Sequence, residues 1–208
     1  LWSVIFAACT VVAYIGLFFV CNFKVLSPGA NDNLTGVFVA VSALKCLKES
    51  GIRYENTEVC ALLTGSEEAG LRGATAFTKR HKGENKDVET YIIAFDTMRD
   101  YDYMTIYHRD MTGMVKNSPE VVALLDEACN DPDVNHPLPH GVVPFGASDA
   151  AAFSRGGFKA AAVAGQNPKY APYYHNRRDT PDQMIPETFA LGLDIALAAI
   201  EAFDRDQK

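Results

Sequence analysis

Three short apolar runs alternate with helical patterns along this chain, and they constrain its fold more than any other feature. They cover Glu58–Thr64, Thr90–Phe95 and Phe158–Ala164. Uninterrupted apolar strands are typical of sheets that are covered on both faces. Strands that alternate with helices predict a layered α/β domain rather than a bundle or an all-β fold.

The predicted helices lie between and after these runs. Val37, Val41, Leu44 and Lys48 lie on one side of the first helix, and Gly51 ends it. Ser118 is a typical N-cap, followed by proline and an acidic residue. We predict helices over about Thr35–Ser50, Gly70–Arg80, Ser118–Cys129 and Pro186–Phe203, a further short strand over Met104–Tyr107, and long loops over Asp131–Pro144 and Gln166–Pro181.

The N-terminal segment, residues 1–24, is hydrophobic, and Leu1–Phe23 contains no charged residue. This length is sufficient for a membrane helix, and a targeting sequence has a similar hydrophobic stretch. Val11–Phe19 is also rich in β-branched and aromatic residues, as a buried strand would be. Periodicity does not separate these alternatives. The first two predict a secreted or membrane-associated protein, which we favour, and the third is compatible with a cytoplasmic one.

Composition restricts the function. The chain has 208 residues and a net charge of −7, which fits one acidic domain. We expect no nucleic-acid binding, because phosphate contacts require clustered Lys and Arg. The five cysteines lie far apart without a CxxC pair, which excludes a zinc ribbon or a dense disulfide scaffold.

Acidic residues follow the predicted strands and precede the first helix. Asp32 lies in a glycine-bounded loop, Glu67 and Glu68 follow one strand, Asp96 ends another, and His175 lies in a late loop. Singly, each has an ordinary explanation as a helix cap, a solvated helix start or a loop residue. At the carboxyl ends of strands they could converge, and carboxylates that face one another need cations to stay ionised. Carboxylates with an imidazole suit zinc.

The local sequences around these residues resemble the co-catalytic zinc aminopeptidases, a family that includes glutamate carboxypeptidase-like members. The matching segments occur in the family's order and span most of the chain from residue 28 onward: Gly29–Gly36, Gly65–Ala74, Ile93–Met98, Ser148–Phe153 and Tyr174–Pro181. The resemblance implies a three-layer α/β sandwich with a mostly parallel, mixed central sheet flanked by helices. It also implies that residues 25–208 form a zinc peptidase-like catalytic domain whose N-terminal part is missing.

The resemblance assigns roles to individual residues. Asp32 would bridge two zinc ions, Glu68 and His175 would complete one ion, and Asp96 would bind the other. Glu67 would act as general base toward a metal-activated water. Tyr174 would help to stabilise the oxyanion. Asp179 would be a hydrogen-bond acceptor that fixes a loop rather than a ligand.

The match fails at two places. Family members carry a His-x-Asp pair upstream, but no histidine precedes His81 here, and Ala150 stands where histidine is common. One of the two zinc sites therefore lacks a ligand. Three interpretations remain open: a zinc exopeptidase acting on a peptide or small amide, an inactive or truncated homologue, and a single-zinc glutaminyl cyclase-like acyltransferase. We favour the aminopeptidase-like exopeptidase; the oligomeric state and the substrate side-chain preference are not predicted.

Overall fold

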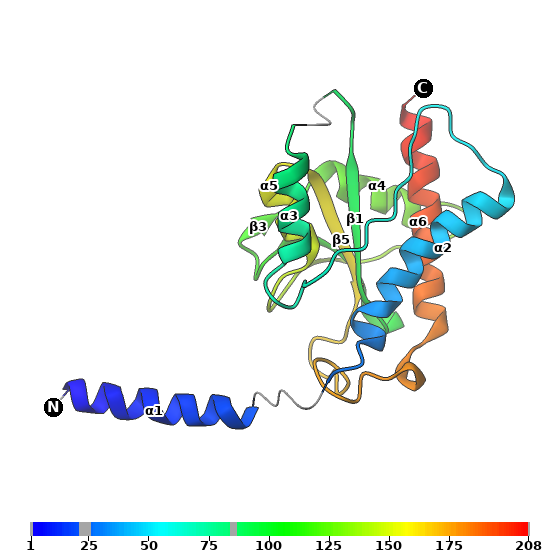
Figure 1. The fold of residues 1–208 in the computed structure, drawn as a ribbon. Helices are drawn as coiled ribbons and strands as arrows, with labels where there is room; N and C mark the ends of the chain where they lie inside the picture. The colour runs from blue at the N-terminus through cyan, green and yellow to red at the C-terminus, as the bar shows by residue number, and fades with distance from the viewer. Residues whose placement is uncertain (1, 21–25, 84–86, 208) are drawn as a thin grey trace.

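The centre of the molecule is a mixed β-sheet. The computed structural model describes residues 2–20, 26–83 and 87–207. Within them the strands follow the order β1 (Tyr91–Met98), β5 (Lys159–Gly165), β2 (Met104–Asp110) and β3 (Val115–Lys116), and β4 (His140–Val142) also pairs with β2. The β1–β5 and β2–β4 pairs are parallel, and β2 runs antiparallel to β5 and β3. The longest pairing, β1 with β5, extends along the whole of β5 (Figure 1).

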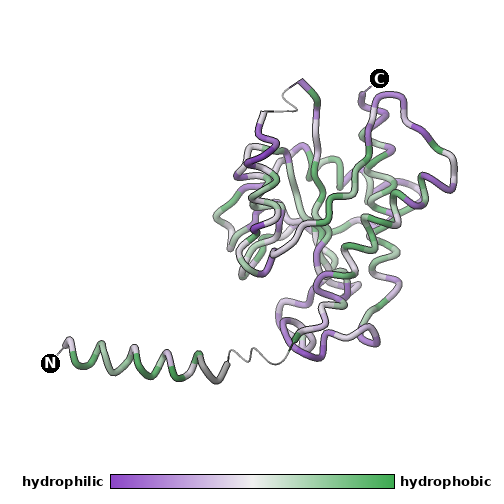
Figure 2. Tube along the Cα trace, in the orientation of Figure 1, coloured by the Kyte–Doolittle hydropathy of each residue, from purple (hydrophilic) through white to green (hydrophobic). Residues whose placement is uncertain are grey.

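Helices cover both faces of this sheet. One face packs against α2 (Thr35–Ser50), α4 (Pro119–Cys129) and α6 (Pro186–Asp206), and the other against α3 (Arg72–His81) and α5 (Asp149–Gly156). Strand β5 serves both cores, because Ala161 and Val163 point into the first and Ala160 and Ala162 into the second. Hydrophobic segments gather along the sheet and the helices that cover it (Figure 2). The predicted α/β three-layer sandwich is confirmed.

The helix positions were predicted better than their buried faces. α2 has the predicted bounds, and α4 begins after Ser118, whose Oγ accepts a hydrogen bond from the Val121 amide at 3.4 Å. The buried face of α2, however, carries Val39, Ala43 and Leu47 instead of the side chosen from the sequence. This face is buried because α2 packs against both β1 and α6.

The prediction of a buried strand over Glu58–Thr64 is wrong. This segment has no regular secondary structure, and Leu62 and Leu63 are 42% and 54% exposed. An apolar run becomes a strand only when a neighbouring strand pairs with its backbone, and among the described residues none does so here. Conversely, β4 forms within the predicted loop Asp131–Pro144, because it pairs with β2.

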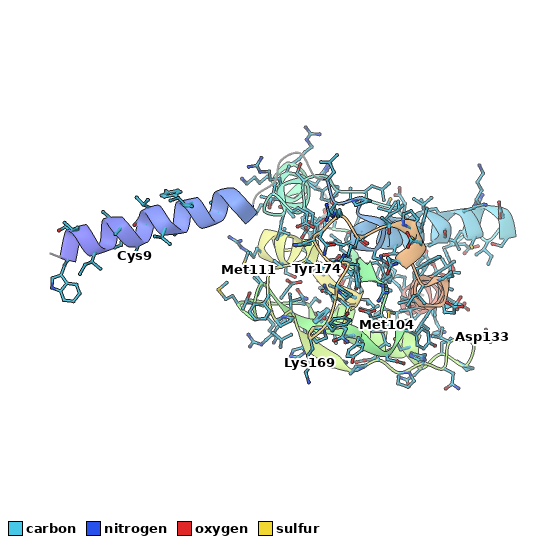
Figure 3. The ribbon with its side chains drawn as sticks, turned by 90° about the horizontal axis from the view of Figure 1, so that it is seen from below. Cys9, Met104, Met111, Asp133, Lys169 and Tyr174 are labelled. Carbon is cyan, nitrogen blue, oxygen red and sulfur yellow. The ribbon has the colours of Figure 1, made fainter. Side chains whose placement is uncertain are left out.

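The N-terminal segment forms helix α1 (Trp2–Val20), so the buried strand proposed for it is not formed. Nearly all side chains from Trp2 to Leu17 are exposed, including Trp2 at 81% and Phe6 at 75%. Figure 3 shows α1, with Cys9 labelled, extending away from the sheet and its helices. Within the described residues, no helix combines the length and the hydrophobicity that a membrane crossing requires.

Candidate metal centre

Asp32 lies in a short turn, η1 (Ala30–Leu34), that a buried carboxylate holds in place. Asp179 Oδ1 accepts hydrogen bonds from the Asn31 backbone amide at 2.8 Å and from Asn31 Nδ2 at 2.7 Å. Asp179 Oδ2 accepts one from the Asp32 amide at 3.0 Å. Asp179 is fully buried, and these three bonds occupy both of its oxygens. The predicted loop-fixing role of Asp179 is confirmed.

The other side of the Asp32 turn is attached to the end of β1. Asn33 Nδ2 donates to the Phe95 carbonyl at 2.8 Å, and Asn33 Oδ1 accepts from the Thr97 amide at 3.1 Å. Gly36 allows this close approach, because a Cβ there would lie 2.1 Å from the Phe95 carbonyl oxygen. Asp32 is therefore brought beside Asp96, which lies in the same strand as Phe95.

A turn closed by its own backbone presents Glu67 and Glu68. The amides of Gly70 and Leu71 donate to the Glu67 carbonyl at 2.9 and 2.7 Å, and the Gly73 amide donates to the Gly65 carbonyl at 2.9 Å. A Cβ on Gly73 would lie 2.5 Å from that carbonyl oxygen, so the start of α3 packs directly on the turn. Glu68 is exposed and Glu67 is half-buried.

A network that sequence analysis missed fixes the loop that carries Tyr174 and His175. Tyr173 is buried, and its hydroxyl donates to Asp100 Oδ2 at 3.1 Å. Asp100 Oδ2 also accepts from the Asn167 amide at 2.8 Å. Arg99 pairs with Asp100 at 2.5 Å, and its guanidinium carbon lies 4.5 Å from the Tyr173 ring centre. Arg99 and Asp100 lie directly after β1, at the same edge of the sheet as Asp96, and this position was the available signal in the sequence.

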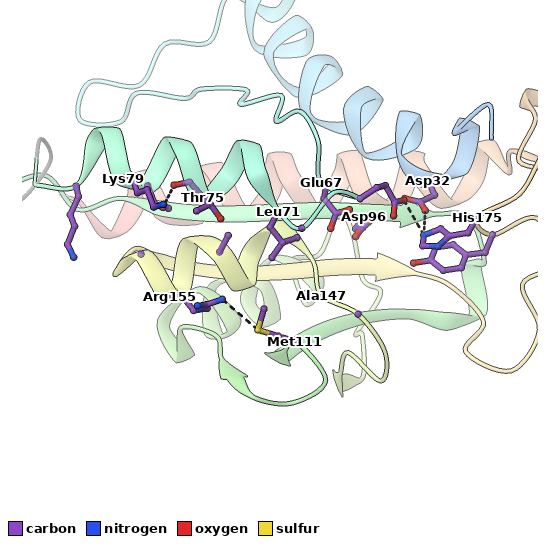
Figure 4. Close-up of a pocket in the computed structure, with 18 residues that line it drawn as sticks. Asp32, Glu67, Leu71, Thr75, Lys79, Asp96, Met111, Ala147, Arg155 and His175 are labelled. Atoms are coloured by element: carbon purple, nitrogen blue, oxygen red, sulfur yellow. Dashed lines mark hydrogen bonds and ion pairs between the residues drawn. The ribbon is translucent and has the colours of Figure 1, made fainter. Parts of the chain in front are cut away.

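Three of the four predicted metal ligands meet. His175 Nε2 lies 3.2 Å from Asp32 Oδ2 and 3.1 Å from Glu68 Oε1. One ligand atom from each of Asp32, Glu68 and His175 lies within 4.8 Å of the other two. Asp96, Glu67 and Tyr174 line the same cavity, and Figure 4 shows Asp96 and Glu67 beside Asp32. Asp96 is not part of the three-residue cluster.

The carboxylates of this cavity repel one another. Burial, with the neighbouring charge of Asp96, raises the pKa of Glu67 to about 8. Burial and the charge of Asp32 raise the pKa of Asp96 to about 7, although a hydrogen bond from Thr97 acts in the opposite direction. The charge of Asp149 also raises the pKa values of both Glu67 and Asp96. One oxygen of Asp149 accepts a hydrogen bond from Thr64, and the other is buried without a hydrogen-bond partner among the described residues. A cation in the cavity would relieve this repulsion.

The side chains opposite the carboxylates have shifted pKa values as well. A hydrogen bond to Asp32 and the charge of Glu68 raise the pKa of His175, against burial. Burial and the charge of Asp32 raise the pKa of Tyr174, so its phenol keeps its proton at neutral pH. The Tyr174 and His175 rings stack with centroids 3.7 Å apart. Tyr174 can therefore donate a hydrogen bond beside the cluster.

The donor set fits one zinc ion. Zinc–oxygen and zinc–nitrogen bonds of about 2.0 to 2.2 Å place neighbouring ligand atoms of a tetrahedral site roughly 3.3 to 3.6 Å apart. The two measured distances from His175 Nε2, 3.2 and 3.1 Å, are close to that spacing. Two carboxylates and an imidazole leave a fourth position for water, as in catalytic zinc sites. Among the described residues, this is the only group of three or more His, Cys, Asp or Glu side chains whose ligand atoms all lie within 4.8 Å of one another.

Residues 16–200 match the family model of peptidase family M28. This chain belongs to that family. A protein described as a probable leucine aminopeptidase of Arthroderma otae is 29% identical over 173 residues, which cover 79% of this chain and 45% of that protein.

Solved aminopeptidases have the same fold. The aminopeptidase of Aneurinibacillus sp. strain AM-1 is 25% identical with a TM-score of 0.69, and the match covers 84% of this chain and 39% of that one. A zinc aminopeptidase of Bacillus subtilis is 22% identical with a TM-score of 0.69, covering 84% and 42%. This M28 chain thus spans less than half the length of these three relatives.

Proposed function

We propose that this M28 chain is a zinc-dependent exopeptidase of the aminopeptidase type. The observation that supports this most is the meeting of Asp32, Glu68 and His175, which come from three distant parts of the sequence, around a space suited to one cation. Family membership supports peptides as the substrates. The name of the Arthroderma relative supports removal of an amino-terminal residue such as leucine.

In this proposal each residue has a separate task. Asp32, Glu68 and His175 hold zinc, which as a Lewis acid would lower the pKa of a coordinated water toward about 7. Glu67 lies in the same cavity, and a bound cation would favour its ionised form against the burial that raises its pKa, so it can accept a proton from the attacking water and return it to the leaving amine. The protonated Tyr174 hydroxyl donates to the developing oxyanion. Asp96 would contribute to a second cation site.

The test separates metal binding from catalysis. Zinc content is measured on the purified chain and on the His175→Ala and Glu68→Ala variants, both of which should lose zinc. Glu67→Gln should keep the zinc and lose hydrolysis of leucine p-nitroanilide by about 10²- to 10⁴-fold. Zinc-free native protein would contradict the metal site, and unchanged turnover in Glu67→Gln would exclude Glu67 as the base.

A second candidate function rests on the same cluster. The three-residue group would hold one ion without Asp96, and three protein ligands are the number that a single-zinc glutaminyl cyclase-like acyltransferase uses. Such an enzyme would release ammonia from peptides with an amino-terminal glutamine and would leave leucine p-nitroanilide intact. Assaying both reactions on the zinc-loaded chain decides between the two candidates.

A further inference from the structure

The cavity of the metal centre continues well beyond the metal ligands. Its volume is about 640 Å³, within the range of sites that enclose a small organic ligand. Beyond the cluster it extends along the side on which α3 and α5 meet, over Leu71, Thr75 and Ala152. Figure 4 shows α3, with Thr75 and Lys79, above α5, with Arg155. A molecule larger than one amino acid can therefore lie along the cavity.

The two ends of this cavity carry opposite charges. The acidic lining residues, Asp32, Glu67, Glu68 and Asp96, gather around His175. The described lining residues with a permanent positive charge, Lys79, Lys82 and Arg155, lie farther along α3 and α5. The positive end is notable because the whole chain has a net charge of −7. Within the described part of the chain, these three cations form no ion pair with a carboxylate.

Close packing of the two helices fixes where the positive end lies. A Cβ on Gly156 would lie 2.6 Å from the Cβ of Thr78, so α3 and α5 touch at this point. Lys79 and Arg155 are the chain neighbours of these two residues, and both line the cavity. The positive charges therefore come from two helices that are held together, although the side chains themselves are exposed.

We propose that the Lys79, Lys82 and Arg155 end of the cavity binds a carboxylate of the substrate. This inference rests on the proposed exopeptidase function and deepens it. A short peptide has an ammonium group at one end and carboxylates farther along, so it would lie with its amino end toward the acidic cluster. Charge complementarity of this kind contributes orientation and specificity. The substrates are therefore short peptides with a free C-terminus or an acidic side chain downstream of the cleaved bond.

Four heptapeptides, each about 23 Å long when extended, separate the two sources of the carboxylate: Leu-(Gly)5-Gln amide, Leu-(Gly)5-Gln, Leu-(Gly)5-Glu amide and Leu-(Gly)5-Glu. Their dissociation constants are measured by calorimetry on the zinc-loaded full chain carrying Glu67→Gln, which blocks turnover. Exposed ion pairs are weak, so we expect each cation that a peptide carboxylate contacts to lower the dissociation constant by up to about fivefold. The difference should decrease at high salt, because exposed charges are screened.

Matched variants locate the effect. Lys79→Gln, Lys82→Gln and Arg155→Gln together should bring all four dissociation constants to the value of the uncharged amide. Arg80→Gln is the control, because Arg80 lies on the same helix but does not line the cavity. Equal dissociation constants for the four peptides, an equal loss in Arg80→Gln, or no binding of any peptide would overturn the proposal.

Turnover of the uncharged amide by the native zinc-loaded chain separates this inference from the proposed function. Hydrolysis without any preference for a carboxylate would overturn the inference alone. Binding that depends on the three cations without hydrolysis would retain the inference and overturn the exopeptidase function.

Discussion

At the scale of single residues, the candidate metal centre depends on side chains that are not themselves proposed ligands. Asp179 is the clearest example, because both of its oxygens are occupied by donors from Asn31 and Asp32. Removal of a group that orients a metal ligand commonly lowers metal affinity by roughly 10- to 100-fold. The position of the Asp32 carboxylate thus depends on a residue 147 positions later in the chain.

Asp179→Asn tests this dependence. The amide group replaces one acceptor oxygen with a donor, so at least one buried hydrogen bond is lost and two donors face each other. We expect the free energy of unfolding to fall by about 1 to 3 kcal/mol and zinc affinity to fall roughly tenfold. Urea unfolding and zinc titration measure the two effects. Asp182→Asn is the control, because Asp182 is exposed in the same part of the chain; equal losses in both variants would contradict the argument.

Gly36 gives a second prediction at this scale. Alanine is intrinsically favoured in a helix by about 1 kcal/mol over glycine. Here, however, its Cβ would lie 2.1 Å from the Phe95 carbonyl oxygen and 2.5 Å from Asn33 Oδ1. The overlap should dominate, so Gly36→Ala should destabilise the protein by about 1 to 3 kcal/mol. Lys48→Ala, at an exposed position of α2, should change the urea midpoint little; stabilisation by Gly36→Ala would refute the close approach.

At the scale of helices and strands, local signals predicted where elements begin and end. Ser118 precedes the start of α4 and Gly51 ends α2, as the sequence indicates, because capping depends on a few neighbouring residues. The buried face of α2 was not predictable in this way. The sheet and α6 both pack against α2, and their positions decide that Val39, Ala43 and Leu47 are buried while Val37 and Val41 are not.

Strand pairing was the least predictable feature of the fold. Glu58–Thr64 has a strand-like composition and no pairing strand among the described residues, whereas β4 has little apolar character and pairs with β2. Pairing is a property of two segments, so neither sequence alone determines it. The grouping of Asp32, Glu68 and His175 was easier to predict, because each of them lies within a recognisable local motif. The position of Asp96 outside their cluster could not be read from its motif.

The loop from Gln166 to Pro181 provides a prediction at this scale. Tyr173→Phe removes the hydroxyl that donates to Asp100, while the ring still packs beside Arg99. We expect a loss of about 1 kcal/mol of stability and weaker zinc binding, because the next two residues are Tyr174 and His175. Tyr170→Phe is the matched control, since Tyr170 is 71% exposed. Zinc affinity that is the same in both variants would show that the hydroxyl does not position the loop.

At the scale of the whole molecule, the repulsion between the buried carboxylates makes stability dependent on pH. The pKa of Glu67 is raised to about 8 and that of Asp96 to about 7, from ordinary carboxyl values near 4. Between about pH 4.5 and 8 the folded chain therefore binds more protons at these groups than the unfolded chain does. Their contribution to stability is fully present below the unfolded pKa and is lost as the pH rises through the folded pKa values.

Zinc should reverse this dependence. A bound cation favours the ionised carboxylates, so zinc uptake should release protons and become stronger as the pH rises from 5 to 8. Urea unfolding in EDTA and in excess zinc measures both trends: the EDTA protein should lose stability over this range, while the difference between the two curves should grow. At a zinc concentration 100 times the dissociation constant, the gain should be about 2.7 kcal/mol. The His175→Ala variant should lose most of the zinc-dependent gain, and a gain that is equal at pH 5 and pH 8 would show that the raised carboxyl pKa values are not linked to metal binding.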